Sequence, residues 1–206
     1  QIYVYDREST STTRISKTLG GLASNGSCYT PSISQDGRFI VYESLATNLD
    51  ANYEAALTST LAVQAFVHDR GLPDEFDEYG DDFATYLVST FAGNPADNDV
   101  VTPKISLDGR VVAFASKASN LGVVNNGFVT QIWSRELDDH GVPINDTELV
   151  SWNAAGTAGG NRDSVEPAIN GGPSAAYGLQ IAFASVADDL ITNDTNEIAD
   201  IFVRDY

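Results

Sequence analysis

Short runs in which apolar and polar residues alternate recur along the whole chain, and no long stretch has the spacing and caps of an amphipathic helix. The runs at 39–44, 111–116 and 180–185 read FIVYES, VVAFAS and QIAFAS, and they are rich in β-branched and aromatic residues. A second set alternates with period 2, as half-buried strands do: QIYVYDR at 1–7, QAFVHDR at 64–70, QIWSREL at 131–137 and DIFVRDY at 200–206. The pattern predicts an all-β protein.

These runs belong to longer segments that align with one another, so the chain contains an internal repeat. The segments cover residues 31–49, 103–121 and 167–190, and the third contains an insertion. Within the first two, Asp36-Gly37 and Asp108-Gly109 supply the positive φ angles that tight turns need. A third set of matches, TTRIS, TYLVST and TELVSW, follows the second set in each unit.

The repeating unit is therefore strand, tight turn, strand, long loop, strand, loop, strand. Four antiparallel strands in this order form one blade of a β-propeller. We name the strands of a unit a, b, c and d. The chain then reads c-d, a-b-c-d, a-b-c-d, a-b-c, which predicts one propeller-like domain over 1–206. Its three repeats span 31–90, 103–152 and 167–206, and the N-terminal strands at 1–16 complete a blade.

The pattern P-x-I-S-x-D-G-R-x-[VI]-[AV]-[FY]-x-S, followed by a D-I-F-V-x-D-like strand, resembles the TolB-type β-propeller repeat family. Two copies of the Asp-Gly-Arg hairpin match well, whereas Gly171-Gly172-Pro173 replaces it in the third. The resemblance implies an extracytoplasmic protein that serves as a scaffold or a protein-binding surface. It implies no single activity, because a fold by itself does not decide function.

About three blades are too few for a ring, since closed propellers need about 4–8. An incomplete ring leaves two open sheet edges, and open edges pair readily with other chains. We therefore expect a non-enzymatic extracellular scaffold that self-associates into a homo-oligomer, as a ring or a filament, by edge-strand pairing. A fragment of a larger propeller protein is the alternative reading. The expected edge residues are Ile2, Tyr3, Val4 and Tyr5 at one end and Ile201, Phe202 and Val203 at the other.

The composition of the chain limits the kinds of binding partner and the cellular location that we expect. The formal net charge is −18, from 29 acidic and 11 basic residues, which argues against nucleic acid and anionic lipid surfaces. No apolar run is long enough to span a bilayer. The absence of methionine and the first residue, Gln1, favour a processed, secreted chain that is extracellular or on the cell surface, with the periplasm possible. The single cysteine, Cys28, is expected to be a small buried residue, with an intermolecular disulfide as the alternative.

Three sequons mark candidate glycosylation sites at Asn25, Asn145 and Asn193. A calcium- or glycan-binding propeller module is a further alternative, and no other cofactor is expected. Asp194, Asn196 and Asp200 offer oxygen ligands at alternating positions, as part of a calcium loop does. Turns that cap a strand explain the same residues. A second acidic cluster, between Asp74 and Asp82, is expected to be a solvated loop, with a metal or partner contact as the other option.

Signals for catalysis are weak, and we expect no enzyme. The only histidines are His68, in the polar phase of a strand, and His140, in a polar turn. No G-x-S-x-G motif and no metal-spaced histidine pair occurs. Paired carboxylates of a glycoside hydrolase stay open as an alternative, because their pairing depends on geometry rather than on spacing in the sequence.

Overall fold

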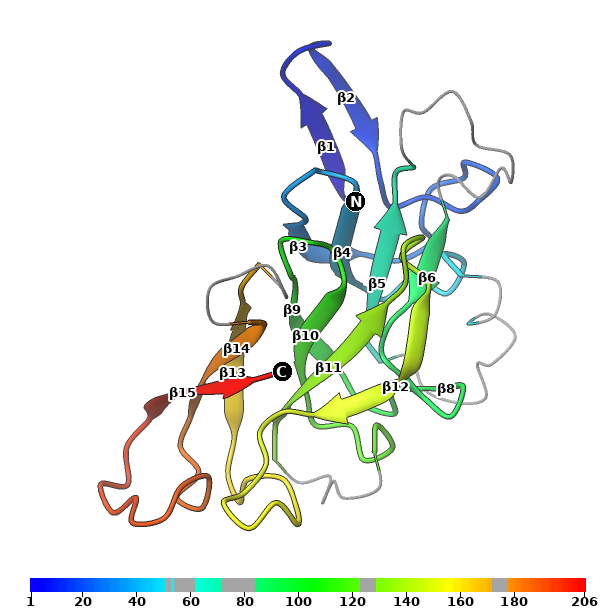
Figure 1. The fold of residues 1–206 in the computed structure, drawn as a ribbon. Coiled ribbons are helices and arrows are strands. Elements are labelled where there is room, and N and C mark those ends of the chain that lie inside the picture. The colour runs from blue at the N-terminus through cyan, green and yellow to red at the C-terminus, as the bar shows by residue number, and fades with distance from the viewer. Residues whose placement is uncertain (51–52, 54–61, 72–83, 123–128, 172–177) are drawn as a thin grey trace.

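The fold was obtained as a computed structural model. The structure describes residues 1–50, 53, 62–71, 84–122, 129–171 and 178–206. These residues form antiparallel sheets that follow one another along the chain: a hairpin, two four-stranded sheets and a three-stranded sheet (Figure 1). The all-β prediction, with four-stranded antiparallel blades in an incomplete ring, is confirmed.

The N-terminal hairpin pairs β1 (Tyr3–Asp6) with β2 (Ser11–Arg14). The first sheet has the order β3-β4-β5-β6, with β3 at Cys28–Ile33, β4 at Phe39–Ser44, β5 at Gln64–Asp69 and β6 at Thr85–Leu87. Strand order within the sheet equals strand order in the chain. This simple meander is what the a-b-c-d pattern predicts.

The second sheet repeats this arrangement with β9 (Val100–Ile105), β10 (Val111–Ser116), β11 (Gln131–Leu137) and β12 (Pro143–Leu149). A short hairpin, β7 (Thr90–Phe91) with β8 (Asn94–Pro95), precedes it and was not predicted. The third sheet contains β13 (Ser164–Ile169), β14 (Gln180–Ser185) and β15 (Asp200–Asp205), without a d strand among the described residues.

The two Asp-Gly turns have the expected geometry. Gly37 and Gly109 have φ of 78° and 74°, in the left-handed region that glycine adopts without strain. In each turn the preceding serine donates a hydrogen bond to the aspartate, from Ser34 to Asp36 and from Ser106 to Asp108. Gly109 is also fixed by packing, because a Cβ there would lie 2.5 Å from the Phe39 ring.

Three apolar clusters join consecutive units, and successive sheets pack face to face, whereas the hairpin contacts the first sheet near its base. The hairpin contacts the first sheet through Ile2, Val4 and Ile15. The first and second sheets share a cluster that includes Val67 and Trp133. The second and third sheets share another, which contains, among others, Ala113, Ala115, Ile132, Ile181, Phe183 and, at its margin, Phe202.

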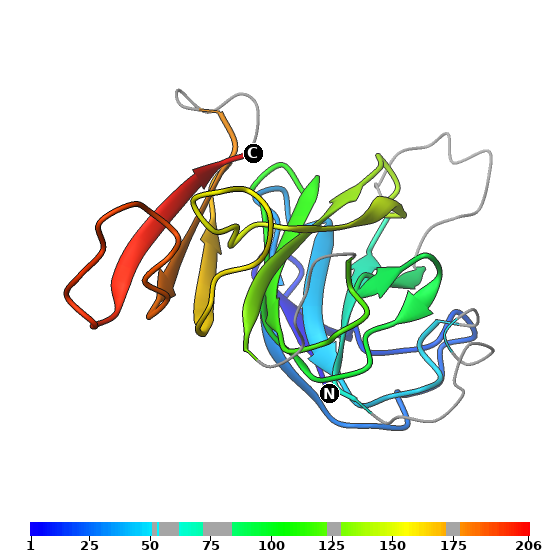
Figure 2. The ribbon, with the colours of Figure 1, turned by 90° about the horizontal axis from the view of Figure 1, so that it is seen from below.

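We call the face of a unit that packs on the next unit its forward face, and the opposite face its rear face. The forward face of the second sheet thus carries Ala113, Ala115 and Ile132, and the rear face of the third sheet carries Phe183 and Phe202. In this row of units the hairpin and the third sheet are the two ends. From below, the third sheet is seen to stand beside the second sheet as the outermost unit (Figure 2). Among the described residues, no helix has the length and apolarity needed to cross a membrane.

Candidate assembly interface

The outer edge of β15 has no strand partner among the described residues. The N–H of Tyr206 donates to the carbonyl of Leu179 at 2.9 Å, on the side of β14. Because main-chain groups alternate in direction along a strand, those of Ile201, Val203 and Asp205 point the other way. That is the side on which β6 and β12 lie in the complete sheets. The third sheet therefore offers an open edge in the d position.

The hairpin has an open edge on the opposite side of its c strand. The N–H of Ile15 donates to the carbonyl of Ile2 at 2.9 Å, so Ile2 and Val4 direct their main-chain groups to β2. Tyr3 and Tyr5 direct theirs outward, where a complete sheet has its b strand. The two ends of the chain thus present unlike edges.

The side chains narrow the predicted set of edge residues. Ile201 and Val203 are 75% and 56% exposed, and Tyr3 and Tyr5 are 57% and 61% exposed. Ile2, by contrast, is buried against the first sheet, and Val4 packs beside it. Phe202 stacks on Phe183 inside the third cluster, with ring centroids 5.8 Å apart. Large exposed apolar side chains therefore alternate with inward ones on both terminal strands.

A glutamine fastens the c strand to the d strand wherever both are present. Gln131 accepts a hydrogen bond from Ser151 and donates to the carbonyl of Gly160, at 2.7 Å for the second bond. Gln64 does the same with Ser89 and Ala96, at 2.6 and 2.8 Å.

In the hairpin, Gln1 accepts from Ser16 at 2.9 Å and donates to the Ser24 hydroxyl at 2.8 Å. The equivalent residue of the third sheet is Asp200, which has no d strand beside it in the described chain. This fastening was missed in the sequence, although the change from Gln to Asp at the last repeat is visible there.

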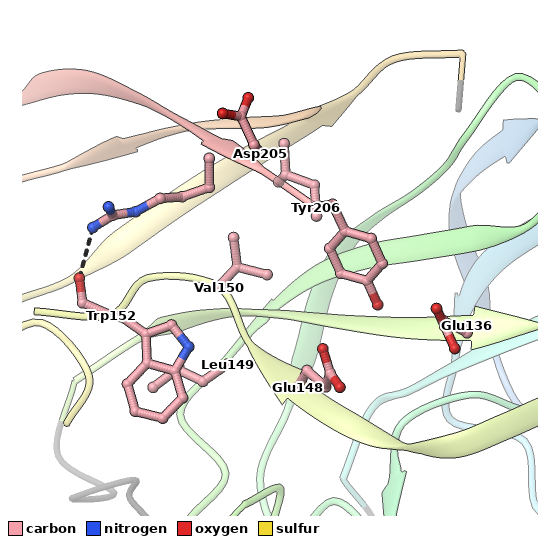
Figure 3. A pocket seen from close by; sticks show the side chains of 9 residues that line it. Glu136, Glu148, Leu149, Val150, Trp152, Asp205 and Tyr206 are labelled. Atoms are coloured by element: carbon pink, nitrogen blue, oxygen red, sulfur yellow. Dashed lines mark hydrogen bonds between the residues drawn. The ribbon is translucent and has the colours of Figure 1, made fainter. Parts of the chain in front are cut away.

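A groove runs beside the open edge of β15, toward β12 (Figure 3). Its volume is about 500 Å³. The lining residues are Glu136, Glu148, Leu149, Val150, Trp152, Ile181, Arg204, Asp205 and Tyr206. Leu149, Val150 and Trp152 come from the end of β12 and the residues after it, and Tyr206 points down between them and Glu136. The groove lies where the third sheet has no d strand.

Electrostatics in the groove are dominated by carboxylates. Burial raises the pKa of the Tyr206 hydroxyl, and the negative charges of Glu148 and Glu136 raise it further. Arg204 donates hydrogen bonds to the carbonyls of Trp152 and Leu190, at 2.8 and 3.2 Å. The guanidinium therefore links the third sheet to the second. Among the described residues, the lining contains neither histidine nor cysteine.

The candidate calcium ligands form hydrogen bonds among themselves. The Asn196 side chain donates to Asp200 at 2.9 Å, and its oxygen accepts from the N–H of Ile198 at 3.1 Å. These are turn contacts. In the part of the chain that the structure describes, no group of three or more His, Cys, Asp or Glu residues is placed to hold a metal. Calcium binding here stays a prediction. The acidic cluster between Asp74 and Asp82 lies outside the described residues.

The sequon asparagines are exposed, and two of them make hydrogen bonds. Asn25 donates to Thr47 at 2.8 Å, and Asn145 donates to Glu136 at 2.6 Å. Asn193 lies in the loop after β14 with φ of 71°. Their glycosylation stays a prediction.

The cysteine and the histidines do not form a catalytic pair. Cys28 is buried, as expected, and lies 3.3 Å from the hydroxyls of Ser24 and Ser44. His68 is buried and contacts Thr85 at 2.8 Å, whereas His140 is exposed on a turn. Burial lowers the pKa of His68 to about 4, and the charge of Lys17 lowers it too.

No family model matches the chain, and no curated protein matches its sequence. Among solved structures, the crystal structure of TolB from Acinetobacter baumannii aligns with a TM-score of 0.47 and 13% identity. The alignment covers 99% of this chain and 34% of that protein, so the chain spans about a third of its length. A similarity at this level leaves the function to be argued from the chain's own residues.

Proposed function

We propose that the chain is a non-enzymatic, extracellular assembly subunit that associates with further copies of itself through the terminal strands β1 and β15. Edge-strand pairing, the mode that the sequence suggests, is one way in which these strands can meet. The proposal needs no bound cofactor. It concerns two parts of the surface that lie at opposite ends of the row of sheets.

The observation that carries the proposal is the state of these two strands. Each has an unpaired edge among the described residues, and each presents large exposed apolar side chains: Tyr3 and Tyr5 at one end, Ile201 and Val203 at the other. Exposed edges and apolar patches are unfavourable on an isolated soluble domain unless a partner covers them. Because the two ends differ, one end of a copy meets the other end of the next. Such a contact gives a ring if it closes and a filament if it does not.

The test is the mass of the protein in solution as a function of concentration. The isolated chain has a mass of 22.0 kDa. Light scattering or sedimentation from micromolar to near-millimolar concentration should give multiples of this mass that increase with concentration. Electron microscopy of the same samples separates rings from filaments. A constant monomer mass over the whole range contradicts the proposal.

A further inference from the structure

The forward face of the third sheet is bare. Ile201 is paired with Ala184, and Val203 with Ala182, so these four side chains share one face. In the aligned repeats they correspond to Ile132, Ala115, Ser134 and Ala113 of the second sheet. All four of those residues are completely buried, and Ile132, Ala115 and Ala113 belong to the cluster that the second sheet shares with the third. The third sheet thus repeats a packing surface that no described residue packs against as the third sheet does on the second.

The rear face of the hairpin is the matching bare surface. Tyr3 lies opposite Arg14, and Tyr5 lies opposite Thr12, so the two tyrosines share the face that points away from the first sheet. The position of Tyr3 is aromatic in every repeat, as Phe66, Trp133 and Phe202. Each of these three is packed in the cluster that joins its own unit to the preceding one. Among the described residues, Tyr3 is the aromatic residue of this set with no unit packed on its side.

We infer that the hairpin of a second copy stacks its rear face on the forward face of the third sheet. Tyr3 and Tyr5 of that copy would then cover Ile201, Val203 and the two alanines. This inference rests on the proposed self-association and specifies the contact that produces it. The interface continues the packing between sheets that the chain already uses within itself. The described residues of each copy provide three sheets and the hairpin, so two copies provide six sheets and two hairpins, and six blades lie within the range of about 4–8 that closes a propeller.

Stacking fits the ends better than antiparallel pairing of β15 with β1. Antiparallel pairing would join the main-chain groups of Ile201 and Val203 to those of Tyr3 and Tyr5, and opposite residues share a face. Phe202 would then lie on the same face as Ile2 and Val4 of the other copy. The second sheet already covers Phe202, and the other copy's own first sheet covers its Ile2 and Val4. Two broad sheets would have to occupy the same side of strands only about 4.8 Å apart.

The residues that fasten the c strand to the d strand also favour stacking over strand pairing. Ser16 of the hairpin is already held by Gln1 of its own copy, and the third sheet has Asp200 instead of a glutamine. The d position of the third sheet therefore lacks the residue that holds a d strand in each of the other units. Stacking of side-chain faces makes no use of this position.

Cross-linking distinguishes the two arrangements. Chains with Val203→Cys and chains with Tyr3→Cys, both in a Cys28→Ala background, are mixed, then either oxidised or treated with a bifunctional maleimide. Stacked sheets lie about 10 Å apart, too far for a disulfide but within reach of a maleimide linker of similar length. Paired strands would bring the two Cα atoms to about 5.5 Å, where a disulfide forms. We expect the maleimide product and no disulfide.

A disulfide-linked dimer would overturn the stacking inference and leave self-association standing. A constant monomer mass without either product would overturn both. The matched control carries Glu197→Cys, at an exposed loop residue, instead of Val203→Cys. It should give neither the disulfide nor the maleimide product above background.

A surface variant supplies a readout that needs no cross-link. Ile201→Glu places a charge on the forward face of the third sheet. Because Ile201 is exposed, the fold should persist. It should weaken association at least about tenfold, which corresponds to about 1.4 kcal/mol. Ile201→Val should associate as the unmodified chain does. Unchanged association of Ile201→Glu contradicts the inference.

Discussion

Strands β10 and β14 have nearly the same sequence, VVAFAS and QIAFAS, but different surroundings. Every residue of β10 is buried, whereas burial alternates along β14 between buried and half-buried positions. The difference arises on the forward face, which the third sheet covers in β10, whereas no further sheet among the described residues covers it in β14. Two almost identical strands thus show that burial here depends on the neighbouring unit rather than on the strand's own residues.

The largest expected effect comes from placing a charge at the same position in both sheets. Ile132→Glu would bury a carboxylate between the second and third sheets, where Ile132 is completely enclosed, and should destabilise the fold by about 4 kcal/mol or more. Ile201→Glu should change the unfolding free energy of the monomer by less than about 0.5 kcal/mol. Urea unfolding of both variants measures the contrast. Equal losses would mean that the two faces are not as different as their exposures indicate.

A second contrast concerns pH and the two histidines, the buried His68 and the exposed His140. Burial lowers the pKa of His68 to about 4 from 6.5, so the unfolded chain binds a proton more readily than the folded chain. Stability from the neutral imidazole is complete above pH 6.5 and decreases as the pH falls toward 4. The loss should approach about 3 kcal/mol, although acidic groups titrate in the same window. Urea unfolding at pH 7 and 4.5 measures it.

His68→Gln should remove a large part of that pH dependence, because an amide does not titrate. His140→Gln, on an exposed turn, should leave the dependence as it is. An identical pH profile for His68→Gln and the unmodified chain would show that this imidazole is not kept neutral by burial.

Two glycines with the same φ of 74° test how tightly the sheets pack. Gly109→Ala would strain the backbone and push a Cβ against the Phe39 ring, at a cost of about 2–3 kcal/mol. Gly178→Ala meets nothing within 4 Å and should cost only about 1 kcal/mol, from the backbone. Melting temperatures of the two variants give the comparison. A larger loss at Gly178 would contradict the packing between the first and second sheets.

The smallest contrast is between Gln131 and its counterpart Asp200. Gln131→Ala leaves Ser151 and the Gly160 carbonyl without their buried partner, which should cost about 1–2 kcal/mol. Asp200→Ala should cost less than about 0.5 kcal/mol, because that residue fastens no d strand. Chemical unfolding resolves the difference. A comparable loss at Asp200 would argue that the third sheet has a partner there in the free chain.

The strands and their order could be predicted because each repeat gives the same pattern several times. The Asp-Gly turns at Gly37 and Gly109 followed from φ requirements that few residues meet. The short β7–β8 hairpin was missed, since Thr90–Phe91 and Asn94–Pro95 are too short to show any periodicity.

The faces of β1 could not be assigned from the sequence. Ile2, Tyr3, Val4 and Tyr5 are all apolar, so an alternation of period 2 cannot tell which side is covered. The pairing of Gln131 with Ser151 was also hidden, because it depends on strands that come together only in the folded sheet. What the sequence lacks in both cases is information on which unit lies next to which.

The hairpin and the third sheet present different surfaces, and this gives any series of stacked copies a direction. In an open series, each added copy that covers one exposed surface brings another of the same kind, so elongation continues unless the two ends meet in a ring. A chain that keeps its third sheet but has Tyr3 and Tyr5 replaced by serine could still bind the hairpin of another copy. Its own hairpin could no longer bind the third sheet of a further copy. A small admixture of such chains would therefore act as a stopper and shorten the population in proportion to its dose.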